Sequence, residues 1–115
     1  MQRGDIYLVD LDPAQGSEAN KKRPAVIVSN DATNRASERN GRGVVTVVPL
    51  TSNTTRVHPF QTLVTTAESG LRLDSKAQAE QVRSVDASSL TQRIGRLTPA
   101  ARARVDLALR THLDL

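Results

Sequence analysis

The strongest constraint on the fold is a pair of short apolar runs, at residues 25–28 and 44–50, in which β-branched side chains follow one another almost without interruption. Runs of this length and composition are typical of strands that are covered on both faces, as in a closed barrel or a covered sheet. Neither run approaches the roughly 20 residues that a membrane-spanning helix needs. Two further segments, residues 4–11 and 60–66, show the looser alternation of ordinary strands. The chain is therefore expected to fold around a mostly β core.

A single strong helix pattern stands at the end of the sequence. Thr98 is suited to cap this helix and Pro99 to occupy its first turn. Five residues then fall on one face at helical spacing, namely Ala101, Val105, Ala108, Leu109 and His112. The opposite face carries a charged i, i+4 ladder, namely Arg102, Asp106 and Arg110.

The other segments are predicted to be polar connections and short strands. Residues 13–23, 31–43 and 51–59 are expected to be loops, and residues 93–97 a short last strand. Residues 77–85 fit a strand, although helix formers also occur there. The predicted architecture is mainly β within the α+β class: a small barrel of at least five strands with the C-terminal helix packed on it.

Length and composition exclude several classes of protein. A chain of 115 residues is expected to form one domain, residues 1–115. It contains no cysteine, which excludes disulfide scaffolds, thiolate metal sites and thiol nucleophiles. Its net charge of +4 weakly favours a polyanionic partner, but Tyr7 and Phe60 are its only aromatic residues. A nucleic-acid site here would therefore depend on hydrogen bonds, Lys and Arg rather than on stacked aromatics.

Targeting and metal-binding signals are also missing from the sequence. Asp5 and Asp10 interrupt any apolar core of a secretory signal, so the protein is expected to be cytoplasmic, with no membrane segment. His58 and His112 have no second His at i+3 or i+4, and no dedicated metal site is expected. The pair of Asp10 and Asp12 before a proline is more typical of turn capping than of catalysis.

Two polar segments, each beside a predicted strand, remain as candidate sites. Arg23 leads directly into the run at 25–28, where its anchored stem would aim a planar fork of donors at a phosphate. Residues 51–56 follow the run at 44–50 and offer a row of hydroxyl and amide groups. The alternative is that both segments are ordinary polar turns.

The same segments carry a resemblance to a known family. Its motifs are spread along the chain, at residues 3–7, 10–13, 16–18, 23–29, 48–53, 59–60, 80–85 and 94–95. In this order and spacing the sequence resembles the MazF/PemK endoribonuclease toxins of bacterial toxin–antitoxin pairs, and is most similar to mycobacterial-type members. The resemblance extends over essentially the whole chain.

The resemblance has implications for fold, partners and activity. It implies an SH3-like β-barrel with a C-terminal helix and short additional helices, assembled as a homodimer. It implies sequence-specific, metal-independent cleavage of single-stranded RNA that leaves a 2′,3′-cyclic phosphate and a 5′-hydroxyl, with no cofactor. It also implies a cognate antitoxin, MazE-like or of another type, whose acidic flexible segment occupies the RNA groove.

The family's catalytic residues match positions in this chain. Arg23 matches the catalytic Arg, Thr51 the catalytic Thr, and Glu18 a Glu of the active-site loop. Because the RNA's own 2′-hydroxyl is the nucleophile, Arg23 is expected to bind the phosphate and Thr51 to donate to a non-bridging oxygen. The general base stays open between Arg23, whose guanidinium normally keeps its proton, and Glu18.

Contacts to RNA are predicted at Ser17, Lys22, Asn53, Arg56 and Gln81. Asn53 departs from the family pattern, because several members have Gln at that position. Asn and Gln differ in reach, so the cleaved sequence cannot be transferred from those members. Gln81 is equally compatible with a hydrogen-bonding position inside the barrel.

Two alternatives use the same fold. A CcdB-like toxin would poison DNA gyrase through an aromatic-containing C-terminus, whereas residues 111–115 contain no Trp. It would also leave Arg23 and Thr51 unexplained. A noncatalytic SH3-like module would bind RNA or protein without strand scission and would tolerate Thr51→Ala.

Overall fold

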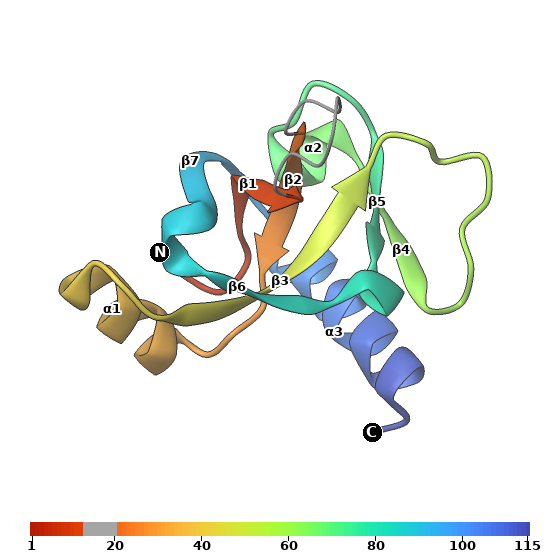
Figure 1. Ribbon diagram of the computed structural model, residues 1–115. Coiled ribbons are helices and arrows are strands. Elements are labelled where there is room, and N and C mark those ends of the chain that lie inside the picture. The colour runs from red at the N-terminus through yellow and green to blue at the C-terminus, as the bar shows by residue number, and fades with distance from the viewer. Residues whose placement is uncertain (13–20) are drawn as a thin grey trace.

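The computed structural model describes residues 1–12 and 21–115, which form an antiparallel sheet with helices around it (Figure 1). In chain order the elements are β1 Asp5–Asp12, β2 Lys21–Ile27, α1 Asp31–Asn40, β3 Val44–Thr51, β4 Gln61–Val64, α2 Thr66–Ser69, β5 Ser75–Gln78, the 3-10 helix η1 Ala79–Gln81, β6 Arg83–Asp86, the 3-10 helix η2 Ala87–Ser89, β7 Leu90–Arg96 and α3 Pro99–Leu113. The mostly β, α+β character expected from the apolar runs is confirmed.

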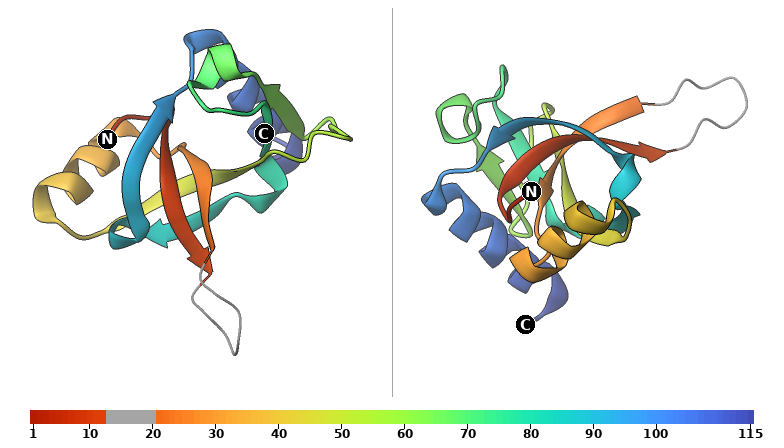
Figure 2. Two further views of the ribbon diagram at one scale, coloured as in Figure 1. Left: turned by 90° about the horizontal axis from the view of Figure 1, so that it is seen from above. Right: turned by 90° about the vertical axis from the view of Figure 1, so that its left-hand side faces the viewer.

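The seven strands form one open sheet in the order β4-β5-β3-β2-β1-β7. Strand β6 lies off this path, because β3 pairs with β6 along its first half and with β5 at its end. Figure 2 shows the strong curvature of the sheet, with α3 packed along one side of it. Within the described ranges the outer strands β4 and β7 do not pair with each other, so the structure has a covered open sheet rather than a closed barrel, and the SH3-like barrel is not confirmed.

Strands β2 and β3 are covered on both faces, as their consecutive apolar residues predict. One face holds Val26 and Val48 in a cluster with Ile6 and with Ala101 and Val105 of α3. The other face holds a second cluster, namely Val9, Leu11, Ala25, Ile27, Val45, Val47 and Val85. Neighbouring residues of these strands thus enter different cores, which explains the lack of polar alternation.

Helix α3 begins where the sequence predicts. The side chain of Thr98 accepts a hydrogen bond from the backbone N–H of Ala101, and Pro99 occupies the first turn. Ala101, Val105 and Ala108 are buried, whereas His112 is exposed and contacts only the ring of Phe60 among the described aromatic and histidine rings. None of the described helices is long and apolar enough to cross a membrane.

The charged side of α3 is used differently from the expected ladder. Asp106 does not pair within the helix: its carboxylate accepts two hydrogen bonds from the guanidinium of Arg3, at 2.8 and 3.1 Å. The backbone N–H of Arg3 in turn donates to Asp31 of α1. Arg3 therefore links the first residues of the chain to both the C-terminal helix and α1.

Residues 31–40 form a helix where a loop was expected. The side chain of Asn30 caps α1 by accepting from the N–H of Thr33, and Gly41 ends it in the left-handed conformation. Its buried residues are polar, and Asn34 donates to the carbonyl of Ser29. Because α1 buries amide and hydroxyl groups rather than an apolar stripe, hydrophobic periodicity does not reveal it.

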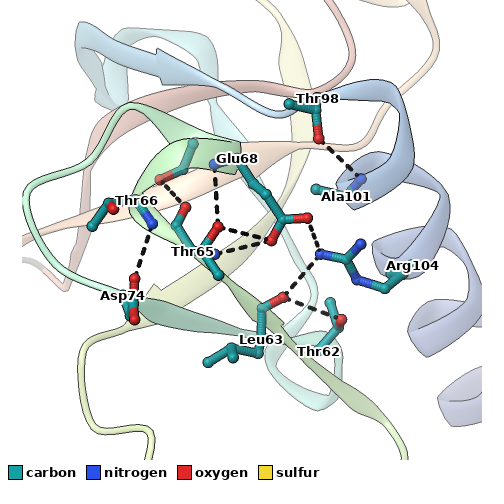
Figure 3. A network of polar contacts seen from close by, with 10 residues as sticks. Thr62, Leu63, Thr65, Thr66, Glu68, Asp74, Thr98, Ala101 and Arg104 are labelled. Carbon is teal, nitrogen blue, oxygen red and sulfur yellow. Dashed lines mark hydrogen bonds and ion pairs between the residues drawn. The ribbon is translucent and has the colours of Figure 1, made fainter.

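A polar network joins α2 to α3 (Figure 3). Thr65 and Glu68 form a reciprocal capping box at the start of α2, and Arg104 of α3 donates to the Glu68 carboxylate. The hydrogen bond from Arg104 lowers the pKa of the Glu68 carboxyl, and the backbone N–H of Thr65 adds to the shift. The network fixes the segment between β4 and β5 against the C-terminal helix.

Candidate nucleic-acid site

Arg23 lies within β2, three residues into the strand, so residues 21–23 do not belong to the expected loop. It pairs with Val9 of β1, and its side chain is exposed. The guanidinium lines a pocket of about 310 Å³. Five further residues line this pocket, namely Leu11, Pro49, Gln78, Gln81 and Arg83.

Thr51 shares a face of the sheet with Arg23. In the antiparallel β2–β3 pair Ala25 lies opposite Pro49, and the pairing ends there. Two residues further along each strand, Arg23 and Thr51 occupy opposing positions, and such positions point to the same side. The Thr51 hydroxyl accepts the backbone N–H of Asn53 at 3.2 Å, which leaves its hydrogen able to donate outward.

The segment after Thr51 is held by its own polar groups. The side-chain oxygen of Asn53 accepts the N–H of Thr55 at 3.3 Å, so its amide nitrogen is still able to donate. The ammonium of Lys76, which lies opposite Thr51 in the β3–β5 pair, donates to the carbonyl of Arg56. Asn53 and Arg56 are both exposed on this segment.

A ring stack anchors the far end of the same segment. His58 stacks on Phe60 with ring centroids 5.1 Å apart, and the ring of His112 in α3 lies tilted to Phe60 with a centroid distance of 6.3 Å. The backbone N–H of His58 donates to Gln61, whose amide nitrogen donates to Glu80 at 2.6 Å. Residues 52–60 are thus coupled to α3 and to η1, the element that carries Gln81.

The structure brings together only part of the predicted site. Arg23 and Gln81 line one pocket, and Thr51 lies on the same face as Arg23. Gln81 is exposed at this pocket rather than inside the sheet. Lys22 alternates with Arg23 and therefore points to the opposite side.

Two further predicted residues, Ser17 and Glu18, lie outside the described residues. Arg56 is exposed but is not among the residues that line the pocket. The direct geometric support for the site therefore rests on Arg23, Thr51 and Gln81.

Gln78 and Arg83 line the pocket but were not predicted as site residues. Residues 77–85 proved to be neither one strand nor one helix, but β5, η1 and β6 in succession. In β5 the buried Ser75 and Ala77 alternate with the half-buried Lys76 and Gln78. This alternation was present in the sequence, but the competing helix formers obscured it.

Acidic groups near the site do not form a metal centre. Asp10 lies inside β1 rather than at a turn, and one of its carboxylate oxygens is buried without a hydrogen-bond partner in the described part of the chain. It borders a second hollow of about 280 Å³ together with Arg83 and Asp86. Among residues 1–12 and 21–115, no three His, Asp or Glu side chains lie together so as to hold a metal ion.

The pocket therefore combines two arginines, Arg23 and Arg83, with two carboxamides, and a hydroxyl lies at a neighbouring strand end. Arg23 offers paired N–H donors suited to a phosphate, and Thr51 offers one O–H. The amides of Gln78 and Gln81 each offer a donor beside an acceptor. No aromatic residue lines the pocket, so a nucleic acid would be held there by charge and hydrogen bonds.

Comparisons with known proteins bear on the family and the fold of the chain. The model of the family "PemK-like, MazF-like toxin of type II toxin-antitoxin system" matches residues 2–113. The chain is 56% identical to the endoribonuclease MazF9 of Mycobacterium tuberculosis over 115 residues, covering 100% of this chain and 98% of that protein. Solved structures agree in fold.

One, an endoribonuclease from a mycobacterial species, has a TM-score of 0.78 at 27% identity and covers 100% of this chain and 92% of that one. Another, a mycobacterial endoribonuclease in complex with its cognate antitoxin, has a TM-score of 0.76 at 28% identity and covers 100% and 96%.

Proposed function

Because the chain belongs to the PemK-like, MazF-like toxins of type II toxin–antitoxin systems, we propose that it is a sequence-specific endoribonuclease that cleaves single-stranded RNA without a metal ion. The observation that carries this proposal is the common face of Arg23 and Thr51 beside a polar pocket. The names of the relatives support the activity. We propose that residues 1–115 form one toxin domain.

The reaction needs no nucleophile from the protein. The 2′-oxygen of the RNA attacks the adjacent phosphorus and forms the cyclic phosphate, while the bond from phosphorus to the 5′-oxygen of the next nucleotide breaks. A base takes the proton of the 2′-hydroxyl, and the departing 5′-oxygen gains a proton to become a hydroxyl. The protein must align these atoms and stabilise the negative charge that gathers on the phosphate.

Arg23 and Thr51 fit this requirement. The guanidinium of Arg23 binds two phosphate oxygens through parallel N–H donors. The hydroxyl of Thr51 donates to a non-bridging oxygen, because a phosphate oxygen only accepts and the Thr51 hydrogen is not used in the N–H bond from Asn53. Donors that are held in position before the substrate arrives would stabilise the transition state more than the ground state.

Two residues are candidates for the general base. Arg23 would have to give up a proton that a guanidinium ordinarily keeps. Glu18 is chemically easier, since an ionised carboxylate accepts the proton of the 2′-hydroxyl directly if it reaches that group. Glu18→Gln separates them: a loss of cleavage with unchanged RNA binding assigns the base to Glu18, and an unchanged rate assigns it to Arg23.

The remaining contacts to RNA are proposed at Ser17, Lys22, Asn53, Arg56 and Gln81. Gln81 offers a carboxamide inside the pocket, and the open amide nitrogen of Asn53 lies two residues after Thr51. The cation of Arg56 would follow the phosphate backbone beside the site, whereas Lys22, on the opposite face of β2, would contact RNA only beyond the pocket.

The expected partners follow from the family. We propose a homodimer, and an antitoxin whose acidic segment covers the RNA site through charge complementarity with Arg23 and Arg56. The solved complex of a mycobacterial relative with its cognate antitoxin supports this proposal. RNA is a cytoplasmic molecule in bacteria, so the proposed activity belongs to that compartment.

The CcdB-like and noncatalytic alternatives are not favoured. If the protein were a gyrase poison, the shared face of Arg23 and Thr51 would have no role. If it were a noncatalytic module, the Thr51 hydroxyl, whose hydrogen is available to donate, would have no role. The relatives named above are endoribonucleases.

The test is an incubation of the purified protein with a long single-stranded RNA in EDTA, followed by mapping of the fragment ends. The proposal predicts discrete cuts with 5′-hydroxyl ends at one short sequence word. An RNA that covers all short words and stays intact would refute it.

A further inference from the structure

We infer that Gln78 reads one base of the RNA word, next to the cleaved phosphate, so that it is a specificity-determining residue. This inference rests on the proposed function. It goes beyond it by assigning base recognition to a residue on β5 that none of the sequence motifs contains.

The backbone places Gln78 at the pocket and outside the core. It is the last residue of β5, directly opposite Gln61 of β4. Its neighbours Ala77 and Ala79 are buried, whereas Gln78 is half-buried and its side chain lines the pocket beside Arg23 and Gln81. Arg23 and Gln78 thus line the same hollow of about 310 Å³, so a nucleotide held there can contact both residues.

The carboxamide of Gln78 is open, and comparison with Gln61 makes this clear. The oxygen of Gln61 accepts the N–H of His58 and its nitrogen donates to Glu80, so both ends of that buried amide are used. In the part of the chain that the structure describes, the Gln78 carboxamide has no hydrogen-bond partner, and neither of its polar atoms is shut off from solvent. Gln61 is thus a structural amide, while Gln78 is free to bind a ligand.

The chemistry of the pocket favours a base as that ligand. Unstacked bases in single-stranded RNA present donors beside acceptors on their edges, and a carboxamide matches such an edge with two hydrogen bonds. No aromatic residue lines the pocket, so a base held there is read by hydrogen bonds rather than by stacking. With the phosphate on Arg23, the base nearest to Gln78 belongs to a nucleotide beside the cleaved bond.

The test measures base preference rather than activity alone. Wild-type protein and Gln78→Leu cleave a pool of RNA with a randomised segment, and sequencing of the fragment ends gives the relative rate for every word. Leu has nearly the shape of Gln but cannot hydrogen-bond. The inference predicts that discrimination at one position of the word falls by about 5- to 150-fold, with the other positions unchanged.

A second variant keeps the polarity of the site. Gln78→Glu replaces the donor by an acceptor, and the preference at the same position is expected to shift toward a base that presents an amino group. Gln2→Leu is the matched control, because Gln2 is exposed, precedes β1 and does not line the pocket. The Gln2→Leu protein is expected to cleave at the same RNA word as the wild type. Circular dichroism confirms that each variant is folded.

The possible outcomes separate the inference from the proposed function. A wild-type protein that leaves the whole pool intact refutes the proposed function and the inference with it. Wild-type cleavage with an unchanged word in both Gln78 variants overturns only the inference. An equal loss of rate on all words in both variants also overturns it, since a residue that reads one base cannot slow every word alike.

Discussion

At the scale of single residues, the hydroxyl of Thr51 is the most sharply testable group. Its oxygen accepts the N–H of Asn53, so only its hydrogen is available for the phosphate. Thr51→Val keeps the shape and removes the hydroxyl, and cleavage is expected to fall about 100- to 1,000-fold, as for the loss of one oxyanion donor. Thr51→Ser restores the donor and should recover most of the rate.

Single-turnover cleavage of a short RNA that contains the mapped word gives these rates. A Thr51→Val protein that is folded and cleaves at the wild-type rate would show that the hydroxyl has no role in the reaction.

The sequence indicates which residues are candidates for the site, but not which other residues lie beside them in space. Arg23 and Thr51 follow from the motifs, and the register of β2 and β3 places them on one face. Gln78 was missed because its partners in the pocket come from β2, β3 and η1, and no local pattern encodes that proximity. Lys22 stands beside Arg23 in the sequence, yet strand alternation turns it away from the pocket.

At the scale of elements, the ring stack is expected to order residues 52–60. Phe60 contacts both His58 and His112, and Phe60→Ala removes both contacts. A pair of this kind contributes about 1 kcal/mol, so hydrogen exchange of amides 52–58 should rise several-fold, with slower RNA cleavage. His112→Ala removes one contact and should have a smaller effect in the same direction.

Mass-spectrometric hydrogen exchange on the free protein measures this change. Equal exchange in wild type and Phe60→Ala would mean that the hydrogen bonds at the Asn53 side chain and at the Arg56 carbonyl hold the segment without the rings.

The contact of Glu68 with Arg104 makes a prediction for stability and pH. Glu68→Gln keeps a residue that fits a capping box but removes the ion pair, and is expected to cost about 0.5–1 kcal/mol at pH 7. The pKa of Glu68 is lowered in the folded protein, chiefly by the hydrogen bond from Arg104. The stabilisation is therefore full above the unfolded pKa of about 4.3 and is lost as the pH falls through the folded value.

Urea unfolding of both proteins at pH 7 and below pH 4 measures the difference in the free energy of unfolding. It should shrink at the lower pH. A difference that stays constant would indicate that Glu68 acts through packing rather than through its charge.

Elements with an apolar signature were predictable and polar ones were not. The runs in β2 and β3 and the capped α3 follow from their side chains, because each buries an apolar face. Helix α1 buries Asn34 and Ser37 instead, and β5 and β6 have only four residues each. Such short or polar elements take their structure from tertiary contacts, which local patterns do not contain.

At the scale of the whole molecule, the sheet is open, whereas the apolar runs in the sequence left a closed barrel and a covered sheet as alternatives. Closure depends on whether the outer strands β4 and β7 meet, which is set by curvature and strand length rather than by composition. The net charge of +4 is also a property of the whole chain, but the response of RNA binding to salt depends on how many phosphates the bound protein contacts.

RNA affinity is therefore expected to fall steeply with salt, and Arg56→Gln should make the fall less steep. Each lost phosphate contact lowers the slope of log affinity against log salt by about 0.7 for a single strand. The probe is an RNA with a 2′-deoxynucleotide at the cut, which lacks the nucleophile and stays intact. Arg39→Gln is the control, because it removes the same charge from an exposed position on α1 outside the proposed site. Equal slopes of log affinity against log salt for the two variants would show that Arg56 does not contact the RNA.

The central claim is that Arg23 and Thr51 act together on one phosphate. Single-turnover cleavage by the wild type, Arg23→Ala, Thr51→Ala and the double variant, each checked for folding, tests it most directly. The account predicts a large fall in the cleavage rate of both single variants. In the double variant the fold-loss should be much smaller than the product of the two single fold-losses, because the two donors serve the same transition state. Near-wild-type cleavage by folded Arg23→Ala would contradict the account.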